Sequence, residues 1–241
     1  MDLAANLAEI RQRIRTACER VGRDPGSVEL VAVSKGQPPD AVDAAVDAGQ
    51  LVFGENKVQE ARAKIPLCSG RATWHLIGHL QTNKCRDAVE LFGMIHSLDS
   101  LRLARELQRW SERFDRRVEV LLEVNLAGES SKFGYRPELL REEWTELQQL
   151  PALTFSGLMT MAPWTTNPEK ARPVFRGLRE LRQQLRDEFQ ADLPHLSMGM
   201  SGDFEVAVEE GATLVRIGTA LFGPRTPRTA STAAKDPSPD A

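Results

Sequence analysis

Eight short apolar runs alternate with helical patterns along this chain, and this alternation restricts the fold more than any other feature. The runs lie near residues 28–34, 51–53, 73–77, 94–97, 118–124, 153–159, 194–198 and 213–217. Strands that alternate with helices pair side by side in a parallel sheet. Eight such units in about 220 residues fit one closed (β/α)8 barrel, the TIM barrel of the α/β class. A doubly wound open sheet is the alternative, because short strands are difficult to count from sequence.

The two ends of the chain differ from the repeating part. Residues 2–21 precede the first strand with an amphipathic pattern, so we predict an extra N-terminal helix whose apolar face packs on the barrel or on a partner. Its apolar stripe consists of Leu3, Leu7, Ile10, Ile14 and Val21. We assign residues 1–223 to the barrel domain. Residues 224–241 are rich in Pro, Thr, Ser and Ala without periodicity, and we expect a disordered tail.

The composition is that of an ordinary globular domain, and it argues against several classes of partner. Hydrophobic residues make up 41% and charged residues 27%, and the net charge of −3 gives no electrostatic reason to expect binding to nucleic acid. No apolar run approaches the ~18 residues of a membrane span, and the N-terminus lacks the pattern of a signal peptide. Three widely spaced cysteines indicate reduced thiols. We expect a cytoplasmic protein that is a monomer, with a weak dimer as the alternative.

Two loops rich in small residues follow the seventh and eighth predicted strands. The first, residues 197–203, precedes a short helix, and the Ser201 hydroxyl there can donate to an anion. In the second, Gly218 allows the backbone to approach a ligand and Thr219 supplies a hydroxyl. The loops after strands seven and eight of such barrels commonly form a phosphate site. We predict one here; the alternative is that Ser201 or Asp203 only caps the helix.

Lys35 ends the first apolar run, where a strand meets its loop at the mouth of the predicted barrel. A lysine that forms a Schiff base must be neutral, and its ordinary pKa is about 10.4. Partial burial and a neighbouring cation lower that value. Arg216 can supply the cation, because the first and eighth strands are neighbours in a closed barrel. An amine facing a phosphate site suits an aldehyde-phosphate cofactor; the alternatives are a solvated Lys35 and an Arg216 paired with a carboxylate.

Other polar positions also invite a functional interpretation. Asn56 follows the second strand, where it can hold a ligand or cap the next helix. His75 and His79 are four residues apart, which is a metal-binding spacing on a helix. They lie on a predicted strand, where four residues span ~13 Å, so we do not expect a shared metal ion. Tyr135, the single tyrosine, follows the fifth strand, and we interpret it as a structural loop aromatic.

Short motifs are spread in order through residues 3–223. They are Val31-Ala32-Val33-Ser34-Lys35, Phe53-Gly54-Glu55-Asn56, Val58-Gln59-Glu60, His75-Leu76-Ile77-Gly78, Leu80-Gln81, Asn83-Lys84, Gly157-Leu158-Met159, Leu196-Ser197-Met198-Gly199-Met200-Ser201 and Val215-Arg216-Ile217-Gly218-Thr219. In combination these motifs are specific, and the chain resembles the pyridoxal phosphate homeostasis protein family. The resemblance implies a single barrel similar to the N-terminal domain of alanine racemase.

For the site, the resemblance implies pyridoxal 5'-phosphate held by Lys35 as a Schiff base. Arg216 would face the pyridine nitrogen, and Asn56 and Met159 would line the cofactor. The residues implied to hold the phosphate are Ser201, Gly218 and Thr219. The resemblance further implies a protein that buffers the cofactor and delivers it to apo forms of pyridoxal phosphate-dependent enzymes, with no turnover established for the family.

Two features favour holding the cofactor over using it. A racemase with this barrel needs a second base, a tyrosine from a further all-β domain, and we expect no such domain here. An arginine opposite the pyridine nitrogen disfavours its protonation, so the ring withdraws electrons poorly. We predict a non-catalytic carrier; the alternatives are a weak amino-acid racemase with Lys35 as base and an interaction protein whose cofactor is vestigial. The chain departs from the family at Lys57, where an aromatic residue is frequent, and in its longer tail.

Overall fold

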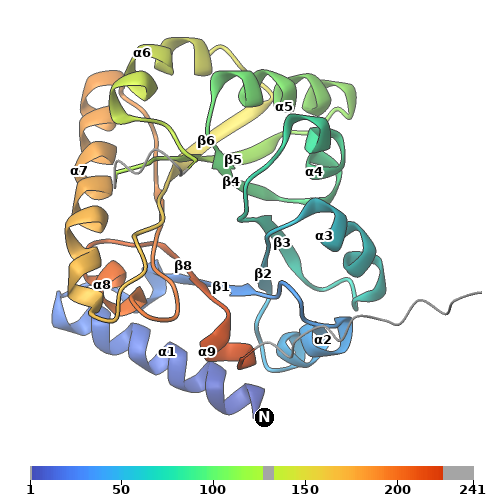
Figure 1. Cartoon of the computed structure of the whole chain (residues 1–241), viewed down its shortest axis with the longest axis vertical. Helices are drawn as coiled ribbons and strands as arrows, with labels where there is room; N and C mark the ends of the chain where they lie inside the picture. The colour runs from blue at the N-terminus through green and yellow to red at the C-terminus, as the bar shows by residue number, and fades with distance from the viewer. Residues whose placement is uncertain (1, 127–132, 225–241) are drawn as a thin grey trace, which may run out of the picture.

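Eight parallel strands form a closed barrel at the centre of the molecule (Figure 1). The structure is a computed structural model that describes residues 2–126 and 133–224. The strands are β1 (Glu29–Val33), β2 (Val52–Glu55), β3 (Thr73–Leu76), β4 (Met94–Leu98), β5 (Val118–Glu123), β6 (Leu153–Met159), β7 (His195–Ser197) and β8 (Leu214–Ile217). They pair in sequence order, and β8 closes on β1 with Val31 opposite Arg216. The predicted barrel is confirmed, and the open sheet is excluded.

A helix follows each strand and lies on the outside of the barrel (Figure 1). These helices are α2 (Pro39–Asp47), α3 (Val58–Lys64), α4 (Cys85–Leu91), α5 (Leu101–Arg113), α6 (Pro137–Leu147), α7 (Arg172–Phe189), α8 (Phe204–Glu209) and α9 (Thr219–Phe222). Local chemistry sets their ends: the Ser100 hydroxyl accepts from the Leu103 N–H at the start of α5, and proline stands in the first turn of α2 and α6.

The extra N-terminal helix is α1 (Leu3–Arg20), and it packs along α8 and α9 (Figure 1). Asp2 caps it, because the Asp2 carboxylate accepts from the Ala5 N–H at 3.0 Å. The buried residues of its apolar face include Leu7, Ile10 and Ile14. The apolar face of α1 therefore packs on the barrel domain and not on a partner, which was the other possibility.

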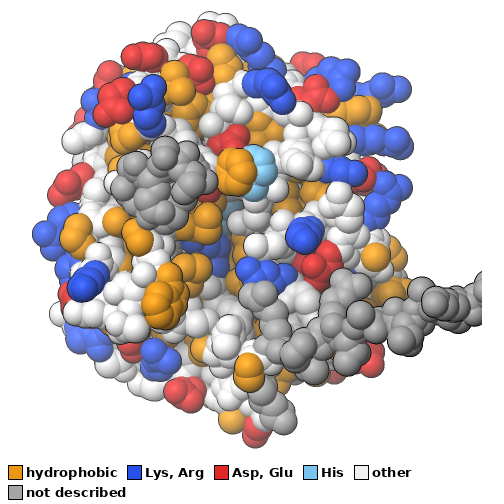
Figure 2. Space-filling view, viewed as in Figure 1, with side chains coloured by type: hydrophobic (Ala, Val, Ile, Leu, Met, Phe, Trp, Pro, Cys, Tyr) orange, Lys and Arg blue, Asp and Glu red, His pale blue; other side chains and the backbone are white. Residues whose placement is uncertain are grey.

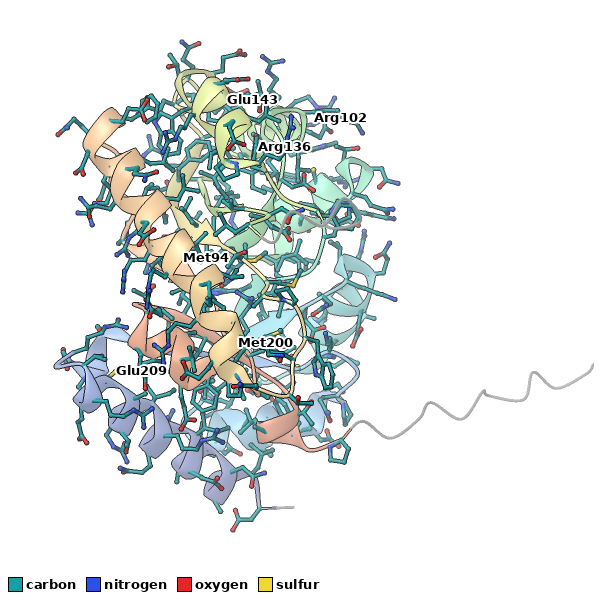
Figure 3. The ribbon with its side chains drawn as sticks, turned by 60° about the vertical axis from the view of Figure 1, so that its left-hand side comes forward. Met94, Arg102, Arg136, Glu143, Met200 and Glu209 are labelled. Atoms are coloured by element: carbon teal, nitrogen blue, oxygen red, sulfur yellow. The ribbon has the colours of Figure 1, made fainter. Side chains whose placement is uncertain are left out.

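The interior of the barrel is filled by side chains and is not a channel. A buried cluster occupies it, and Met94, one of its members, is labelled in Figure 3. The cluster consists of Val31, Val33, Ile77, Met94, Leu121, Met159 and Leu214. A larger apolar layer lies between the strands and the surrounding helices. Alternate side chains of a strand point to opposite faces, so each strand contributes to both apolar layers. In barrels of this kind the binding site lies at the carboxyl ends of the strands and in the loops that follow them.

The last described helix ends close to the predicted domain boundary. α9 ends at Phe222, and the next residue, Gly223, has a φ of +77° that favours glycine. Residues 225–241, nearly all of the predicted tail, lie outside the described residues, so the boundary at 223 stays a prediction. In the described part of the chain, no helix is both long enough and apolar enough to cross a membrane.

Candidate functional site

A pocket of about 400 Å³ opens at the carboxyl ends of the strands, where the face shown in Figure 2 is hollowed near its middle. Two members of the interior cluster, Val33 and Ile77, line it, so the pocket rests on the filled barrel. Its lining includes six of the seven predicted site residues, namely Lys35, Asn56, Ser201, Arg216, Gly218 and Thr219. The seventh, Met159, is fully buried in the interior cluster, and its contact with a ligand stays a prediction.

The end of β1 brings Lys35 to the pocket. The Ser34 N–H donates to the carbonyl of Gly54 on β2 at 3.1 Å, which extends the strand pairing to the residue before the lysine. Gly36 then turns the chain with a φ of +75°, a conformation that favours glycine. The Lys35 side chain is half-buried. Because β1 pairs with β8, Lys35 and Arg216 line the same pocket, as the closed barrel predicts.

Arg216 lies on β8 and is only 4% exposed, yet it lines the pocket. Its guanidinium donates to the Ser197 hydroxyl at 2.5 Å and to the Thr160 carbonyl at 2.9 Å, and neither acceptor is a carboxylate. Burial lowers the pKa of Arg216 to about 10, while the charges of Glu123 and Asp203 act in the opposite direction. Arg216 therefore stays a cation at neutral pH. Because a guanidinium carries five N–H donors, these two bonds leave capacity for a ligand.

A buried chain of polar side chains holds the hydroxyl that Arg216 contacts. His96 Nδ1 lies 2.9 Å from Ser197 Oγ, and His96 Nε2 lies 3.1 Å from His75 Nδ1. Burial lowers the pKa of His75 to about 4 and that of His96 well below its usual range, so both rings are neutral at pH 7. His96 was not among the residues predicted from the sequence. The available signal was a histidine inside a strand that is mostly apolar.

The two small-residue loops meet at the pocket. The Ser201 hydroxyl accepts from the Ala220 N–H of α9 at 3.4 Å, so it does not cap the helix that follows it. Asp203 precedes α8, but its carboxylate accepts from the Met200 N–H at 2.6 Å (Met200 is labelled in Figure 3). A Cβ at Gly199 would lie 2.6 Å from a side-chain carbon of α8. Only glycine therefore allows the first loop to pack this closely.

Asn56 lines the pocket and also carries a buried, unsatisfied atom. Its Oδ1 is buried and has no hydrogen-bond partner among the described residues. The residue before α3 is Lys57, and no side chain caps that helix, so Asn56 is not its cap. Because a buried polar atom without a partner is unfavourable, the arrangement fits a ligand that supplies a donor.

The outer rim of the pocket was not predicted from the sequence. Gln37, Met161 and Trp164 line the mouth, and Met161 and Trp164 are 40% and 86% exposed. Both apolar residues lie in the loop between β6 and α7. A tryptophan in a loop after a barrel strand was the available signal, since loops at this end of the barrel form the site.

The two histidines considered as metal ligands have separate partners. His75 contacts the second histidine of the buried chain, whereas His79 lies 3.2 Å from the Asp99 carboxylate and stacks on Phe133. Within residues 2–126 and 133–224, no group of three or more His, Cys, Asp or Glu side chains is placed to hold a metal ion. Tyr135 is buried in the apolar core, and its backbone pairs with the end of β5.

Sequence relatives agree with the fold and with the motifs. The alanine racemase N-terminal domain family matches residues 5–226. A pyridoxal phosphate homeostasis protein from Aquifex aeolicus is 46% identical over 93% of this chain and 99% of that protein. A protein of the same name from Pseudomonas aeruginosa is 44% identical over 92% of this chain and 96% of that protein.

Solved structures agree as well. PipY from Synechococcus elongatus, solved with PLP bound, superposes with a TM-score of 0.83 at 41% identity and covers 92% of this chain and 100% of its own. Alanine racemase from Clostridium difficile has a TM-score of 0.69 at 14% identity and covers 92% of this chain and 56% of its own, which is a likeness of fold alone. The chain therefore belongs to the pyridoxal phosphate homeostasis protein family, within the wider family of the alanine racemase N-terminal domain.

Proposed function

We propose that this protein holds pyridoxal 5'-phosphate in the pocket, buffers it and delivers it, without turning over a substrate. The observation that carries the proposal is that a lysine, a buried cationic arginine and two small-residue loops line one pocket. The names of the relatives, and PLP bound to PipY, support it. When bound, the cofactor would supply an aldehyde that condenses with a primary amine and releases one water molecule.

The residues of the pocket fit this ligand. Lys35 would supply the amine. The Ser201 hydroxyl, together with the backbone at Gly218 and Thr219, would hold the phosphate, since hydroxyl and backbone N–H donors suit an anion. The unpartnered Oδ1 of Asn56 would gain a donor from the ligand.

Arg216 favours a carrier over a catalyst. Its buried guanidinium would face the pyridine nitrogen as a hydrogen-bond donor, which leaves that nitrogen unprotonated. An unprotonated ring is a poor sink for electrons, so the site does not favour carbanion chemistry. Ser197 and His96 would hold the guanidinium in place, and Met159 would line the ring from the barrel interior.

The racemase alternative requires a second base in the pocket. Tyr135, the tyrosine of this chain, is buried in the core, and it is not among the residues that line the pocket. We therefore keep Lys35 as an anchor in the proposal rather than as a base.

The cellular part of the proposal rests on the family. We propose that apo forms of pyridoxal phosphate-dependent enzymes receive the cofactor, and that the protein acts as a monomer in the cytoplasm. The barrel domain, residues 1–223, would be the unit that carries the cofactor.

Replacing Lys35 with alanine is expected to abolish the covalent bond to the cofactor. Wild-type protein mixed with pyridoxal phosphate should show a visible absorption band that borohydride bleaches. Mass spectrometry of the reduced protein should then place a pyridoxyl group on the peptide that contains Lys35. The variant should show neither signal, because the amine is missing.

Lys57→Ala is the matched control, because it removes an exposed lysine beside the pocket residue Asn56 and should keep both signals. A variant at residue 35 that retains the reducible band, or a wild-type protein that binds no pyridoxal phosphate, would overturn the proposal. Proton exchange at the α-carbon of an amino acid, lost in Lys35→Ala, would instead favour the racemase.

A further inference from the structure

A buried charged cluster lies against the turn that carries Lys35. It consists of Glu55 at the end of β2 and of Glu60 and Lys64 on α3, and we call it the Lys64 cluster. Lys64 is 6% exposed and Glu55 is fully buried, while Glu60 is 32% exposed. Both carboxylates belong to the sequence motifs, but neither is among the proposed cofactor contacts.

The Lys64 cluster binds both neighbours of Lys35. On one side, the Ser34 hydroxyl donates to Glu55 Oε1 at 2.6 Å, and the Ser34 carbonyl accepts from Lys64 Nζ at 2.7 Å. On the other side, the Gly36 N–H donates to Glu60 Oε1 at 2.5 Å. The lysine of the pocket therefore stands between two residues that are fixed from β2 and α3.

Each N–H donor of the Lys64 ammonium group has an acceptor nearby. Lys64 Nζ contacts Glu55 Oε1 at 2.7 Å and Glu60 Oε1 at 3.2 Å, in addition to the Ser34 carbonyl. These three acceptors match the three N–H donors of an ammonium group, which is the condition for burying its charge. Removing Lys64 would leave Glu55 buried without its cation, so Lys64 is the riskier position to change.

Glu60 is the most exposed member of the cluster, so replacing it disturbs the core less than replacing Glu55 or Lys64. Burial acts to raise its pKa, but the Gly36 N–H and the Lys64 charge outweigh burial, so the pKa of Glu60 is lowered. The carboxylate is therefore ionised at neutral pH, and its bond to Gly36 is charge-assisted. A turn that contains glycine is intrinsically soft, and this bond restrains it.

We propose that the Lys64 cluster positions the Lys35 amine for condensation with the aldehyde of pyridoxal phosphate, with Glu60, Glu55 and Lys64 as positioning residues. The inference rests on the proposed function. An amine held in place before the bond forms loses less entropy when it reacts, so the restrained turn favours the covalent complex. A structural role alone would act equally on every ligand of the pocket.

Pyridoxine 5'-phosphate separates these roles, because it keeps the ring and the phosphate but has an alcohol in place of the aldehyde. The experiment measures the dissociation constants of both ligands for wild type, Glu60→Ala and Glu60→Gln, and the rate at which the borohydride-reducible bond forms. We expect Glu60→Ala to weaken the binding of pyridoxal phosphate about tenfold, as the loss of one charge-assisted hydrogen bond implies. The borohydride-reducible bond should also form more slowly. Its affinity for pyridoxine phosphate should stay within about twofold of wild type.

Glu60→Gln keeps an acceptor for the Gly36 N–H and should recover most of the affinity. Glu106→Ala is the matched control, because Glu106 is a 27% exposed helical glutamate that bonds to Arg109 on α5 and is not among the pocket-lining residues. This variant should leave the dissociation constants of both ligands unchanged.

Two results would overturn the inference. One is that Glu60→Ala weakens the binding of both ligands equally, and the other is that Glu60→Ala changes neither the binding of pyridoxal phosphate nor the rate of bond formation. Failure of the proposed function looks different, because wild-type protein would then form no reducible bond at Lys35. Thermal unfolding of each variant confirms that the compared proteins are folded.

Discussion

Replacing Gly78 with alanine is expected to lower the free energy of unfolding by about 3 kcal/mol, at the upper end of the range for overpacking. Gly78 follows β3 and is buried. A Cβ at this position would lie 2.3 Å from the carbonyl oxygen of Asn56 and 2.8 Å from its Cα. Both are backbone atoms, so no side-chain rotation relieves the clash and one strand end must move.

The same substitution should also weaken the binding of pyridoxal phosphate about tenfold, which is the equivalent of one lost hydrogen bond. The reason is that Asn56 is the residue displaced, and Asn56 lines the pocket. Chemical denaturation and a binding titration measure the two effects on one variant.

Gly177→Ala is the control of opposite sign. Gly177 lies inside α7, where a Cβ would meet only a side-chain carbon of Leu126 at 3.7 Å, an ordinary contact. Alanine should stabilise this helix by up to about 1 kcal/mol. An unfolding free energy of Gly78→Ala within about 0.5 kcal/mol of wild type would show that β2 and β3 do not approach this closely in solution.

Acidification is expected to remove about 3 kcal/mol of stability through His75 alone. Burial lowers the pKa of His75 from 6.5 to about 4 in the folded protein. Between these two values the unfolded chain binds a proton that the folded protein does not, so stability is lost as the pH falls from about 6.5 to about 4. His96 adds to the loss, because burial lowers its pKa in the same direction.

Glu123 acts in the opposite direction. Burial raises its pKa to about 7, with Asp99 adding to the rise and Arg216 opposing it. The folded protein therefore binds a proton at a higher pH than the unfolded chain does, and this contribution grows as the pH falls from about 7 to about 4.5. The total pH dependence mixes both signs, so the contribution of His75 must be measured as a difference between two proteins.

The difference is between wild type and His75→Gln, whose amide can still contact His96 but does not titrate. Denaturant unfolding at pH 7 and at pH 4 should show that the variant loses about 3 kcal/mol less than wild type. Equal losses in the two proteins would mean that His75 titrates near its ordinary value in the folded state.

Much of the fold follows from local patterns. The eight strands lie within a few residues of their predicted positions, because a run of apolar residues bounded by turn residues specifies a buried strand without reference to the rest of the chain. Lys35, Asn56, Ser201 and Thr219 could be placed at a barrel mouth for the same reason, since each directly follows such a run or its short loop. The proximity of Lys35 to Arg216 then followed from barrel closure.

The sequence by itself thus determined the class of fold, the family and the chain positions of most pocket residues. Only the tertiary structure decided which polar groups meet. His75, His96 and Ser197 come from three strands, and the Lys64 cluster joins a strand end to a helix end. The periodicity of a sequence indicates which face of one helix or strand is apolar. It does not specify the distance between two polar atoms that lie on different elements. These distances are determined by the strand register and by the packing of the helices on the closed barrel. They decide which hydrogen bonds hold the Arg216 guanidinium and the turn around Lys35.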